Sequence, residues 1–216
     1  MNTAKIVAIT NPLVDGVETA DQFIAYAARV SNPSNQMNSE TSEKLLKYCI
    51  KNSHWSVFEM VNVVMEIETT RDIARQILRH RSFSFQEFSQ RYADPTKDLG
   101  FVTREARLQD NKNRQNSIDI DDTHLQNEWY RAQQRVLFAV EREYKWAIDN
   151  GIAKEQARAV LPEGLTVSRM YMNGTLRSWI HYCELRMTLG TQKEHRIVAE
   201  SAWNQLATYF KFLVKQ

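Results

Sequence analysis

The sequence predicts a single domain that mixes helices with strands. Its 216 residues suit one hydrophobic core and need no linker. In several segments apolar residues recur at helical spacing, and in others they alternate with polar residues at a period of two. Both patterns occur along the whole chain, so we expect one mixed fold rather than separate helical and strand domains.

Composition and charge limit the class of protein. Hydrophobic residues make up 43% of the chain, and no apolar run approaches the ~18 residues of a membrane span. The start lacks the long apolar core of a signal peptide, so we expect a soluble, cytosolic protein. A formal charge of +2 is too small for a general nucleic-acid binder. Cys49 and Cys183 form no Cys-x-x-Cys pair, which predicts two buried thiols and no zinc or redox site.

The first elements are a strand and a helix. Residues 5–9 alternate as a short strand, and Asn-Pro and Asp-Gly turns follow. Thr19 and Gln22 then form a capping box for a helix that ends near Pro33. The predicted apolar face of this helix comprises Phe23, Ile24, Ala27, Ala28 and Val30.

A second helix is predicted over residues 39–51. Acids lie in its first turn and bases lie late, which suits the helix dipole: these are Glu40, Glu43, Lys47 and Lys51. His54 follows the helix and, on local grounds, is a loop histidine. Residues 61–67 are predicted to form a strand.

The stretch 70–92 holds five arginines and no lysine. The planar guanidinium of arginine presents several N–H donors and suits a phosphate or a carboxylate better than the point charge of a lysine does. Apolar residues recur at helical spacing up to Leu78, and a period of two follows it. We therefore expect a helix that runs into an extended segment, with Arg79-His80-Arg81 at the junction. A solvated helix face is the alternative, but such a face would mix lysines and acids among the arginines.

The middle of the chain is polar from residue 104 to residue 122 and is predicted to be a loop or lid. The aspartates of this segment, Asp119, Asp121 and Asp122, could indicate a metal site, but their spacing favours a solvated insertion. From Thr123 a long helix is expected to run to Asn150-Gly151. Its predicted buried stripe is Leu125, Trp129, Ala132, Val136, Val140, Tyr144 and Ala147. A shorter helix over 154–160 is stopped by Pro162.

The last third begins with a strand over 167–172 and a turn at Asn173-Gly174. Thr175 is expected to cap a helix that runs through Leu189. On this helix Arg177, His181 and Glu184 share one face.

Arg186 lies on the opposite face, among Trp179, Tyr182 and Cys183. No acid occurs at helical spacing on that face, so the guanidinium needs an anion or other acceptors, or its stem must carry it to water. The final helix is expected to open with a capping box of Thr191 and Glu194. Its apolar residues, Ile197, Trp203, Leu206, Phe210 and Leu213, predict core or subunit interface.

Several motifs resemble one known family. Arg79-His80-Arg81, Ser84, Glu87, Ser89 and Arg91 resemble the Arg-His-Arg-x-x-Ser-x-x-Glu-x-Ser-x-Arg signature of the flavin-dependent thymidylate synthases. The resemblance extends over residues 27–206 apart from an insertion at 98–127. Its other segments are Ala27 to Ser31, His54 with Phe58 and Glu59, Gln156 to Pro162, Leu176 to Trp179, and Glu184 to Arg186. Departures from the family pattern are Val57, Met60, Thr175 and Gly190.

The resemblance implies an α+β single domain over residues 1–216, with a central, mainly antiparallel sheet flanked by helices and an insertion or lid at about 98–127. It implies a homotetramer whose subunits share active sites. The implied reaction is reductive methylation of dUMP to dTMP, with methylenetetrahydrofolate as the carbon donor and NADPH, acting through FAD, as the reductant. No metal, nucleic acid or membrane is implied.

The resemblance also implies the roles of particular residues. Arg186 is the expected catalytic residue. The expected dUMP-binding residues are Gln76, Arg79, Glu87, Phe88, Ser89, Gln90, Arg91, Arg158 and Arg186. The expected FAD-binding residues are Ser31, His54, Ser56, Arg79, His80, Arg81, Glu87, Thr175, Arg177 and His181. The chain has six glycines and no G-x-G-x-x-G motif, so side chains are expected to hold the phosphates.

A different class of function fits part of the same stretch. Arg79, Arg81 and Arg91 lie near three phenylalanines, and together they could form a stacking platform for single-stranded nucleic acid. The phenylalanines are Phe83, Phe85 and Phe88.

Overall fold

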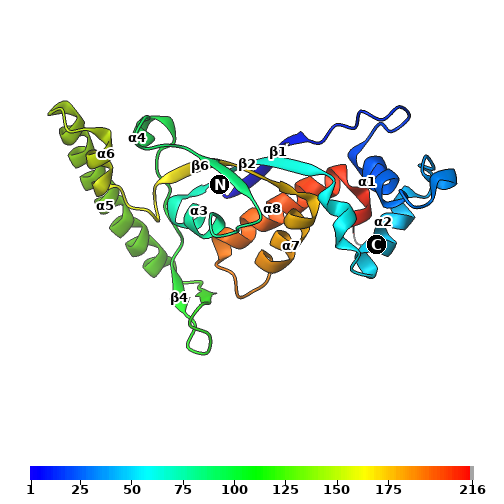
Figure 1. Cartoon of the computed structure of the whole chain (residues 1–216). Helices are drawn as coiled ribbons and strands as arrows, with labels where there is room; N and C mark the ends of the chain where they lie inside the picture. Colours follow the sequence, from blue (N-terminus) through cyan, green and yellow to red (C-terminus); the bar gives the residue numbers. More distant parts are fainter. Residues whose placement is uncertain (215–216) are drawn as a thin grey trace.

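The computed structural model describes residues 1–214 and shows a four-stranded antiparallel sheet with helices packed against it (Figure 1). The strand order is β1-β2-β6-β3. The strands are β1 (Thr3–Ile9), β2 (Asn62–Thr70), β6 (Val167–Thr175) and β3 (Ser84–Glu87). The α+β class and the antiparallel sheet are therefore confirmed, although the last two residues of the predicted domain lie outside the described range.

The sheet buries one face. Val63, Met65 and Ile67 of β2 alternate with Glu66 and Glu68, so a period of two places these three apolar residues on the same side. Two helices cover that side, α7 (Leu176–Arg186) and α8 (Lys193–Tyr209) (Figure 1). The polar side carries cross-strand pairs, such as the Tyr171 hydroxyl donating to Glu66 at 2.7 Å.

The N-terminal helices pack beside one end of the sheet. Helix α1 (Ala20–Ala28) has the predicted capping box of Thr19 and Gln22, but Val30 lies beyond its end and is 68% exposed. Helix α2 (Ser42–Lys51) begins three residues later than predicted, so Glu40 is not in its first turn. Two short 3-10 helices occur here, η1 (Pro33–Asn35) and η2 (Trp55–Glu59).

The arginine-rich stretch folds as its periodicity predicted. Helix α3 (Arg71–Ile77) follows β2 directly and leads through Arg79-His80-Arg81 into β3. Beyond β3, the short helix α4 (Pro95–Asp98) is capped by Asp94, whose carboxylate accepts from Thr96 N at 3.0 Å.

The polar insertion is not an irregular loop. It contains a two-stranded hairpin of β4 (Arg107–Gln109) and β5 (Ser117–Asp119). Two of its aspartates have structural roles, because Asp119 pairs with Lys193 at 3.0 Å and Asp122 caps the next helix by accepting from Leu125 N. Local composition missed the hairpin because few of its residues are apolar.

The long helix is α5 (Thr123–Asp149), and it ends where Gly151 takes a φ of +78°. The predicted buried stripe is only half correct. Tyr144 and Ala147 are buried against α6 (Lys154–Ala157), and Val140 is also buried, but Trp129 is 44% exposed. The other exposed apolar residues of α5 are Leu125, Tyr130, Val136, Phe138 and Trp146.

Two predictions near the C-terminus are wrong. Asn173-Gly174 forms no turn, because both residues pair with β2 inside strand β6. A Cβ on Gly174 would lie 2.4 Å from the Phe83 ring, so the glycine permits close packing rather than a turn. Helix α7 ends at Arg186, three residues before Leu189.

Helix α8 lacks the predicted capping box, because Gln192 is its N-cap residue and no side chain caps it. Of the residues expected to pack, Leu206 and Phe210 are buried but Ile197 is 37% exposed. The last 3-10 helices are η3 (Arg158–Val160) and η4 (Lys211–Leu213), which buries Leu213. The described residues include no helix long and apolar enough to cross a membrane.

Candidate active site

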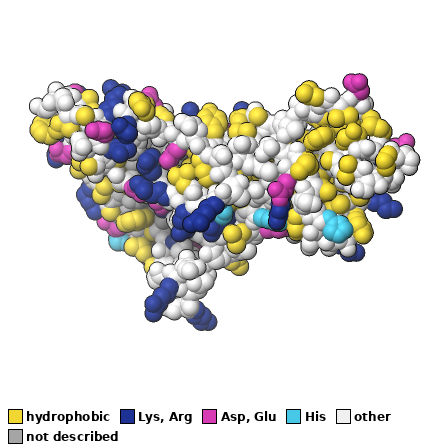
Figure 2. All heavy atoms as spheres, in the orientation of Figure 1, with side chains coloured by type: hydrophobic (Ala, Val, Ile, Leu, Met, Phe, Trp, Pro, Cys, Tyr) yellow, Lys and Arg dark blue, Asp and Glu magenta, His cyan; other side chains and the backbone are white. Residues whose placement is uncertain are grey.

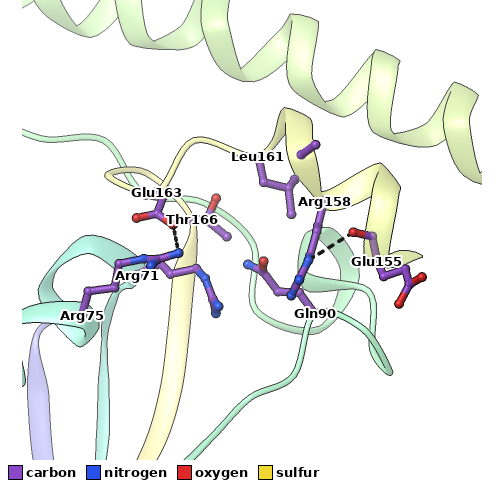
Figure 3. Close-up of a pocket in the computed structure, with 9 residues that line it drawn as sticks. Arg71, Arg75, Gln90, Glu155, Arg158, Leu161, Glu163 and Thr166 are labelled. Carbon is purple, nitrogen blue, oxygen red and sulfur yellow. Dashed lines mark hydrogen bonds and ion pairs between the residues drawn. The ribbon is translucent and has the colours of Figure 1, made fainter. Parts of the chain in front are cut away.

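Two neighbouring cavities gather most of the predicted nucleotide-binding residues. The first, which we call the Arg158 cavity, has a volume of about 400 Å³ and lies between α3 and the segment that follows α5 (Figure 3). Arg71, Arg75, Arg158 and the buried Gln90 line it with Glu155, Ala159, Leu161, Glu163 and Thr166. Three guanidinium groups facing one cavity favour an anionic ligand.

The ion pairs around this cavity are exposed. Arg75 pairs with Glu163, and both side chains are largely accessible to solvent. Arg158 donates through Nε to the backbone oxygen of Glu155 at 3.3 Å. Exposed pairs are worth only ~0–1 kcal/mol, so an anionic ligand can displace a carboxylate at little cost.

The second cavity, which we call the Arg186 cavity, has a volume of about 650 Å³. Its lining includes Gln76, Arg79 and Arg186, and Arg75 contributes to both cavities. The remaining lining residues are Gln115, Gly190, Thr191 and Gln192. None of these lining residues is acidic, so the cavity presents donors to an anionic or carbonyl-bearing ligand. Figure 2 shows a cluster of Lys and Arg with histidine beside it near the middle of the face shown.

Arg186 finds a histidine rather than an acid as its partner. Its Nε donates to Nε2 of His80 at 2.9 Å. Burial, followed by the positive charges of Arg186 and Arg79, lowers the pKa of His80 to about 4. His80 is therefore neutral at pH 7 and can accept the hydrogen bond. This bond satisfies one donor of Arg186 without neutralising its charge.

Among the signature residues, Glu87 is turned inward. Its carboxylate accepts from the Ser168 hydroxyl at 2.7 Å and pairs with Arg71 at 3.3 Å. Ser89 accepts through Oγ from the backbone N–H of Arg91, which makes it part of a local turn. These contacts fix the backbone of the segment that contains Phe88 and Gln90.

Arg91 does not line either cavity. Its Nε lies 3.5 Å from Glu155, which itself lines the Arg158 cavity. The side chain is thus beside the cavity, and its position is set by an exposed ion pair.

The residues expected to hold FAD come from two regions. Arg79, His80 and Arg81 occupy the junction between α3 and β3. In the second region, the His181 ring lies 4.6 Å from that of Trp55, and Arg177 pairs with Glu59.

The other expected FAD residues lie at element ends. Thr175 caps α7 by accepting from Ser178 N at 3.2 Å, whereas His54, Ser56 and Ser31 are exposed. The chemistry of this set fits a dinucleotide, because exposed hydroxyl, imidazole and guanidinium donors suit its diphosphate.

The sequence indicated no role for Gln192 or His195, and it marked Arg71 and Arg75 only as members of the arginine-rich stretch 70–92. Arg71 and Arg75 are one helical turn apart, which could have indicated a shared face. No local signal marked His195, because its contacts come from distant segments. Among residues 1–214, no group of three or more His, Cys, Asp or Glu side chains is placed to hold a metal ion.

The stacking-platform alternative does not fit the structure. The Phe83 ring packs 4.9 Å from that of Trp179, and Phe85 also packs against the core. Half-buried rings of this kind offer no open surface for bases, and none of the similar proteins described below supports that function.

The fold and the two cavities define an α+β protein with arginine-lined cavities whose chemistry suits anionic ligands. Residues 12–210 match the family described as thymidylate synthase complementing protein, Thy1. The chain is 52% identical over 194 residues to a probable flavin-dependent thymidylate synthase of Paramecium bursaria Chlorella virus 1, covering 89% of this chain and 88% of the viral protein. It is 48% identical over 201 residues to the flavin-dependent thymidylate synthase of Synechocystis sp., covering 92% and 91%. The chain belongs to the flavin-dependent thymidylate synthase family.

Solved structures agree with this assignment. A UMP/dUMP methylase, PolB from Streptomyces cacaoi, bound with 5-Br UMP, has a TM-score of 0.77 and 26% identity, covering 97% of this chain and 90% of that one. The same methylase bound with 5-Br dUMP has a TM-score of 0.78 and 25% identity, covering 99% and 93%.

Proposed function

We propose that the chain converts dUMP to dTMP, with methylenetetrahydrofolate as the carbon donor and NADPH, acting through FAD, as the reductant. The observation that carries the proposal is the Arg186 cavity, where Arg79 and Arg186 face the open space with no acid among the lining residues. Uracil C5 becomes nucleophilic when negative charge on N3 and O2 is stabilised, and a guanidinium can do this.

Arg186 is the catalytic residue of this proposal. His80 holds its Nε at 2.9 Å, which leaves the terminal N–H groups for the uracil ring. The interaction strengthens as N3 loses its proton and C5 gains electron density, so it lowers the barrier more than it tightens ground-state binding. Gln76 and Arg79 line the same cavity and hold the ring beside Arg186.

The phosphate of dUMP is assigned to the neighbouring Arg158 cavity. Arg158 and Gln90 line it, and Arg91 lies beside it through Glu155. Bidentate guanidinium contacts with phosphate are strong and directional. The remaining dUMP residues, Glu87, Phe88 and Ser89, shape this segment of backbone.

FAD is assigned to side chains of two regions. Bound there, it supplies the hydride that reduces the transferred carbon to a methyl group. Arg79, His80, Arg81 and Glu87 come from the signature segment. The other FAD residues are Ser31, His54, Ser56, Thr175, Arg177 and His181. The ion pair of Arg177 with Glu59 is half-exposed and weak, so a phosphate of FAD replaces Glu59 as the partner of Arg177.

No thiolate is required by this proposal. Burial raises the pKa of Cys49 and of Cys183, and both thiols are free and buried. Neither thiol is placed to attack a nucleotide at neutral pH.

Residues 1–216 form one domain in this proposal, and the insertion at 98–127 borders the nucleotide site. The protein works in the cytosol as a homotetramer whose subunits share active sites. The exposed apolar face of α5 supports assembly, because Phe138 is 70% exposed and Trp146 is 57% exposed. Light scattering should give four chains per particle, and a fully active monomer would contradict the shared sites.

The experiment that tests the function measures tritium release from C5-labelled dUMP by the purified protein. A visible flavin spectrum and tritium release that needs both methylenetetrahydrofolate and NADPH are expected. The same preparation is titrated against a fluorescent single-stranded oligonucleotide. A colourless protein that takes up no FAD but binds the oligonucleotide would overturn the proposal.

A further inference from the structure

His195 is a buried histidine whose two ring nitrogens are both paired. It lies in the first turns of α8, and its side chain has no solvent exposure. Nδ1 is 3.3 Å from Oε1 of Gln76, and Nε2 is 3.1 Å from the hydroxyl of Tyr182. Gln76 also lines the Arg186 cavity, so a residue with no contact with solvent touches one that faces the proposed substrate.

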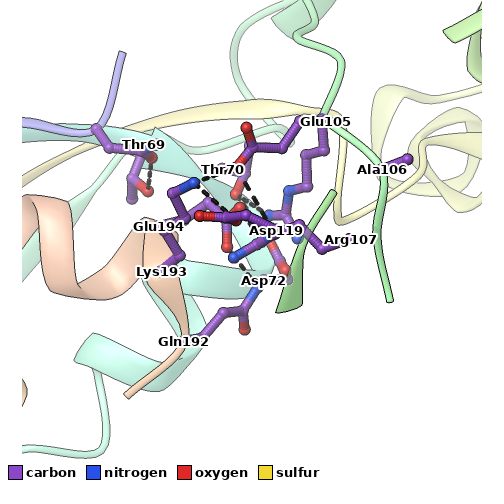
Figure 4. Close-up of polar contacts among 12 residues, drawn as sticks. Thr69, Thr70, Asp72, Glu105, Ala106, Arg107, Asp119, Gln192, Lys193 and Glu194 are labelled. Atoms are coloured by element: carbon purple, nitrogen blue, oxygen red, sulfur yellow. Dashed lines mark hydrogen bonds and ion pairs between the residues drawn. The ribbon is translucent and has the colours of Figure 1, made fainter. Parts of the chain in front are cut away.

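The hydrogen bonds continue beyond Gln76 in one line. Nε2 of Gln76 donates to Oε1 of Gln192 at 2.8 Å, and Nε2 of Gln192 donates to Oε2 of Glu194 at 3.0 Å. The other carboxylate oxygen of Glu194 pairs with Arg107 of the β4–β5 hairpin. Figure 4 shows Gln192, Glu194 and Arg107 converging at the start of α8.

Glu194 fixes the direction of every bond in the line. Burial alone would raise its pKa, but hydrogen bonds from Arg107, its own backbone N–H and Gln192 together lower it. An ionised carboxylate can only accept, so Gln192 must present its NH₂ to Glu194 and its carbonyl to Gln76. Gln76 must then present its NH₂ to Gln192 and its carbonyl to His195.

The state of His195 follows from both ends of the line. A carbonyl of Gln76 facing Nδ1 requires an N–H there. Burial raises the pKa of Tyr182, which keeps its hydroxyl protonated and able to donate to Nε2. Burial, then the charges of Arg186, His80 and Arg79, lower the pKa of His195 to about 3. A neutral ring with its proton on Nδ1 satisfies every partner.

We propose that His195 is a positioning residue that holds the carbonyl of Gln76 inward, so that the amide offers an N–H to the nucleotide. One N–H of Gln76 stays unused by the line and is available to the cavity. With the carbonyl turned away, Gln76, Arg79 and Arg186 present only donors, which select the acceptor oxygens of dUMP. The inference rests on the proposed function, because it gives Gln76 a nucleotide to bind.

The proton position can be tested without any ligand. The chain has five histidines, so magic-angle-spinning NMR of protein labelled with ¹⁵N-histidine gives a simple spectrum. We expect two neutral rings at pH 7 with the proton on Nδ1, those of His80, whose Nε2 accepts from Arg186, and of His195. Only the second signal should be absent from the His195→Leu variant. A His195 ring with its proton on Nε2, or on both nitrogens, would overturn the inference.

The effect on binding is tested with dUMP as the titrated ligand. His195→Leu and Gln76→Leu should each weaken binding on the order of 10-fold, and the double variant should be no weaker than Gln76→Leu alone. His195→Gln keeps one donor and one acceptor and should restore most of the affinity. The matched control is His124→Leu at an exposed position of α5, which should bind as wild type does.

The two failures give different results. Effects of His195→Leu and Gln76→Leu that multiply would overturn the positioning role, and so would a His195→Gln variant as weak as His195→Leu. A wild-type protein that binds no dUMP would instead overturn the proposed function, while the NMR spectrum still decides the orientation of Gln76.

Discussion

The Nε atom of Arg186 donates to Nε2 of His80 across 2.9 Å, although the two residues lie far apart in the sequence. The bond joins the end of α7 to the junction after α3. It orients a guanidinium toward a cavity without giving it a counter-ion, because His80 is neutral at pH 7. Arg186 keeps its full charge for a ligand.

Arg186→Ala should fold and bind FAD yet lose methylation by roughly 100-fold or more, the loss seen when one preorganised donor to a developing anion is removed. The measurement is tritium release from C5-labelled dUMP, normalised to bound flavin. Arg131→Ala on the exposed face of α5, where Arg131 pairs only with Glu128 among the described residues, is the control. Equal release by the Arg186 variant and wild type would end the assignment.

Arg91→Lys should weaken dUMP binding by about 1.5–3 kcal/mol, since lysine keeps the charge but loses the planar fork. Calorimetry with dUMP measures the change. Arg158→Lys should have an effect at least as large, because Arg158 lines the cavity and Arg91 only borders it. Unchanged dUMP affinity in both variants would contradict the assignment of the dUMP phosphate to the Arg158 cavity.

Gly174→Ala should destabilise the protein by about 1–3 kcal/mol, the usual cost of overpacking a core. The added Cβ meets the Phe83 ring at 2.4 Å, and that ring is packed on Trp179. Urea unfolding measures the loss. Gly190→Ala is the matched control, because its added Cβ meets nothing within 4 Å. Its urea midpoint should equal that of wild type within experimental error. A Gly174→Ala midpoint equal to that of wild type would show that Phe83 yields without cost.

Stability should fall as the pH drops below about 6.5. Burial lowers the folded pKa of His195 to about 3 and that of His80 to about 4, so the unfolded chain binds more protons in this range. Each neutral ring therefore stabilises the fold fully above pH 6.5, and the stabilisation falls by up to ~1.4 kcal/mol per pH unit toward the folded pKa.

Urea midpoints at pH 7, 6 and 5 measure this slope. His195→Leu should flatten it, whereas His124→Leu, at an exposed position, should leave it unchanged. A slope that is the same in wild type and His195→Leu would contradict the buried neutral ring.

Local sequence patterns predicted the elements that depend on neighbours in the chain. The capping box of Thr19 and Gln22, the helix-to-strand change around Arg79 and the cap at Thr175 all involve residues within a few positions of each other. The arginine excess without lysine indicated an anion site, and the signature motif indicated the family. These signals are short-range, so a linear reading captures them.

The tertiary structure decided the partners. The strand order β1-β2-β6-β3 brings the junction after α3 to α7 and α8, and only this arrangement gives Arg186 its histidine and Gln76 its contact with His195. It also places Gly174 against Phe83, where a turn was predicted. Contacts of this kind depend on sheet register and helix packing between distant segments, and no local periodicity encodes them.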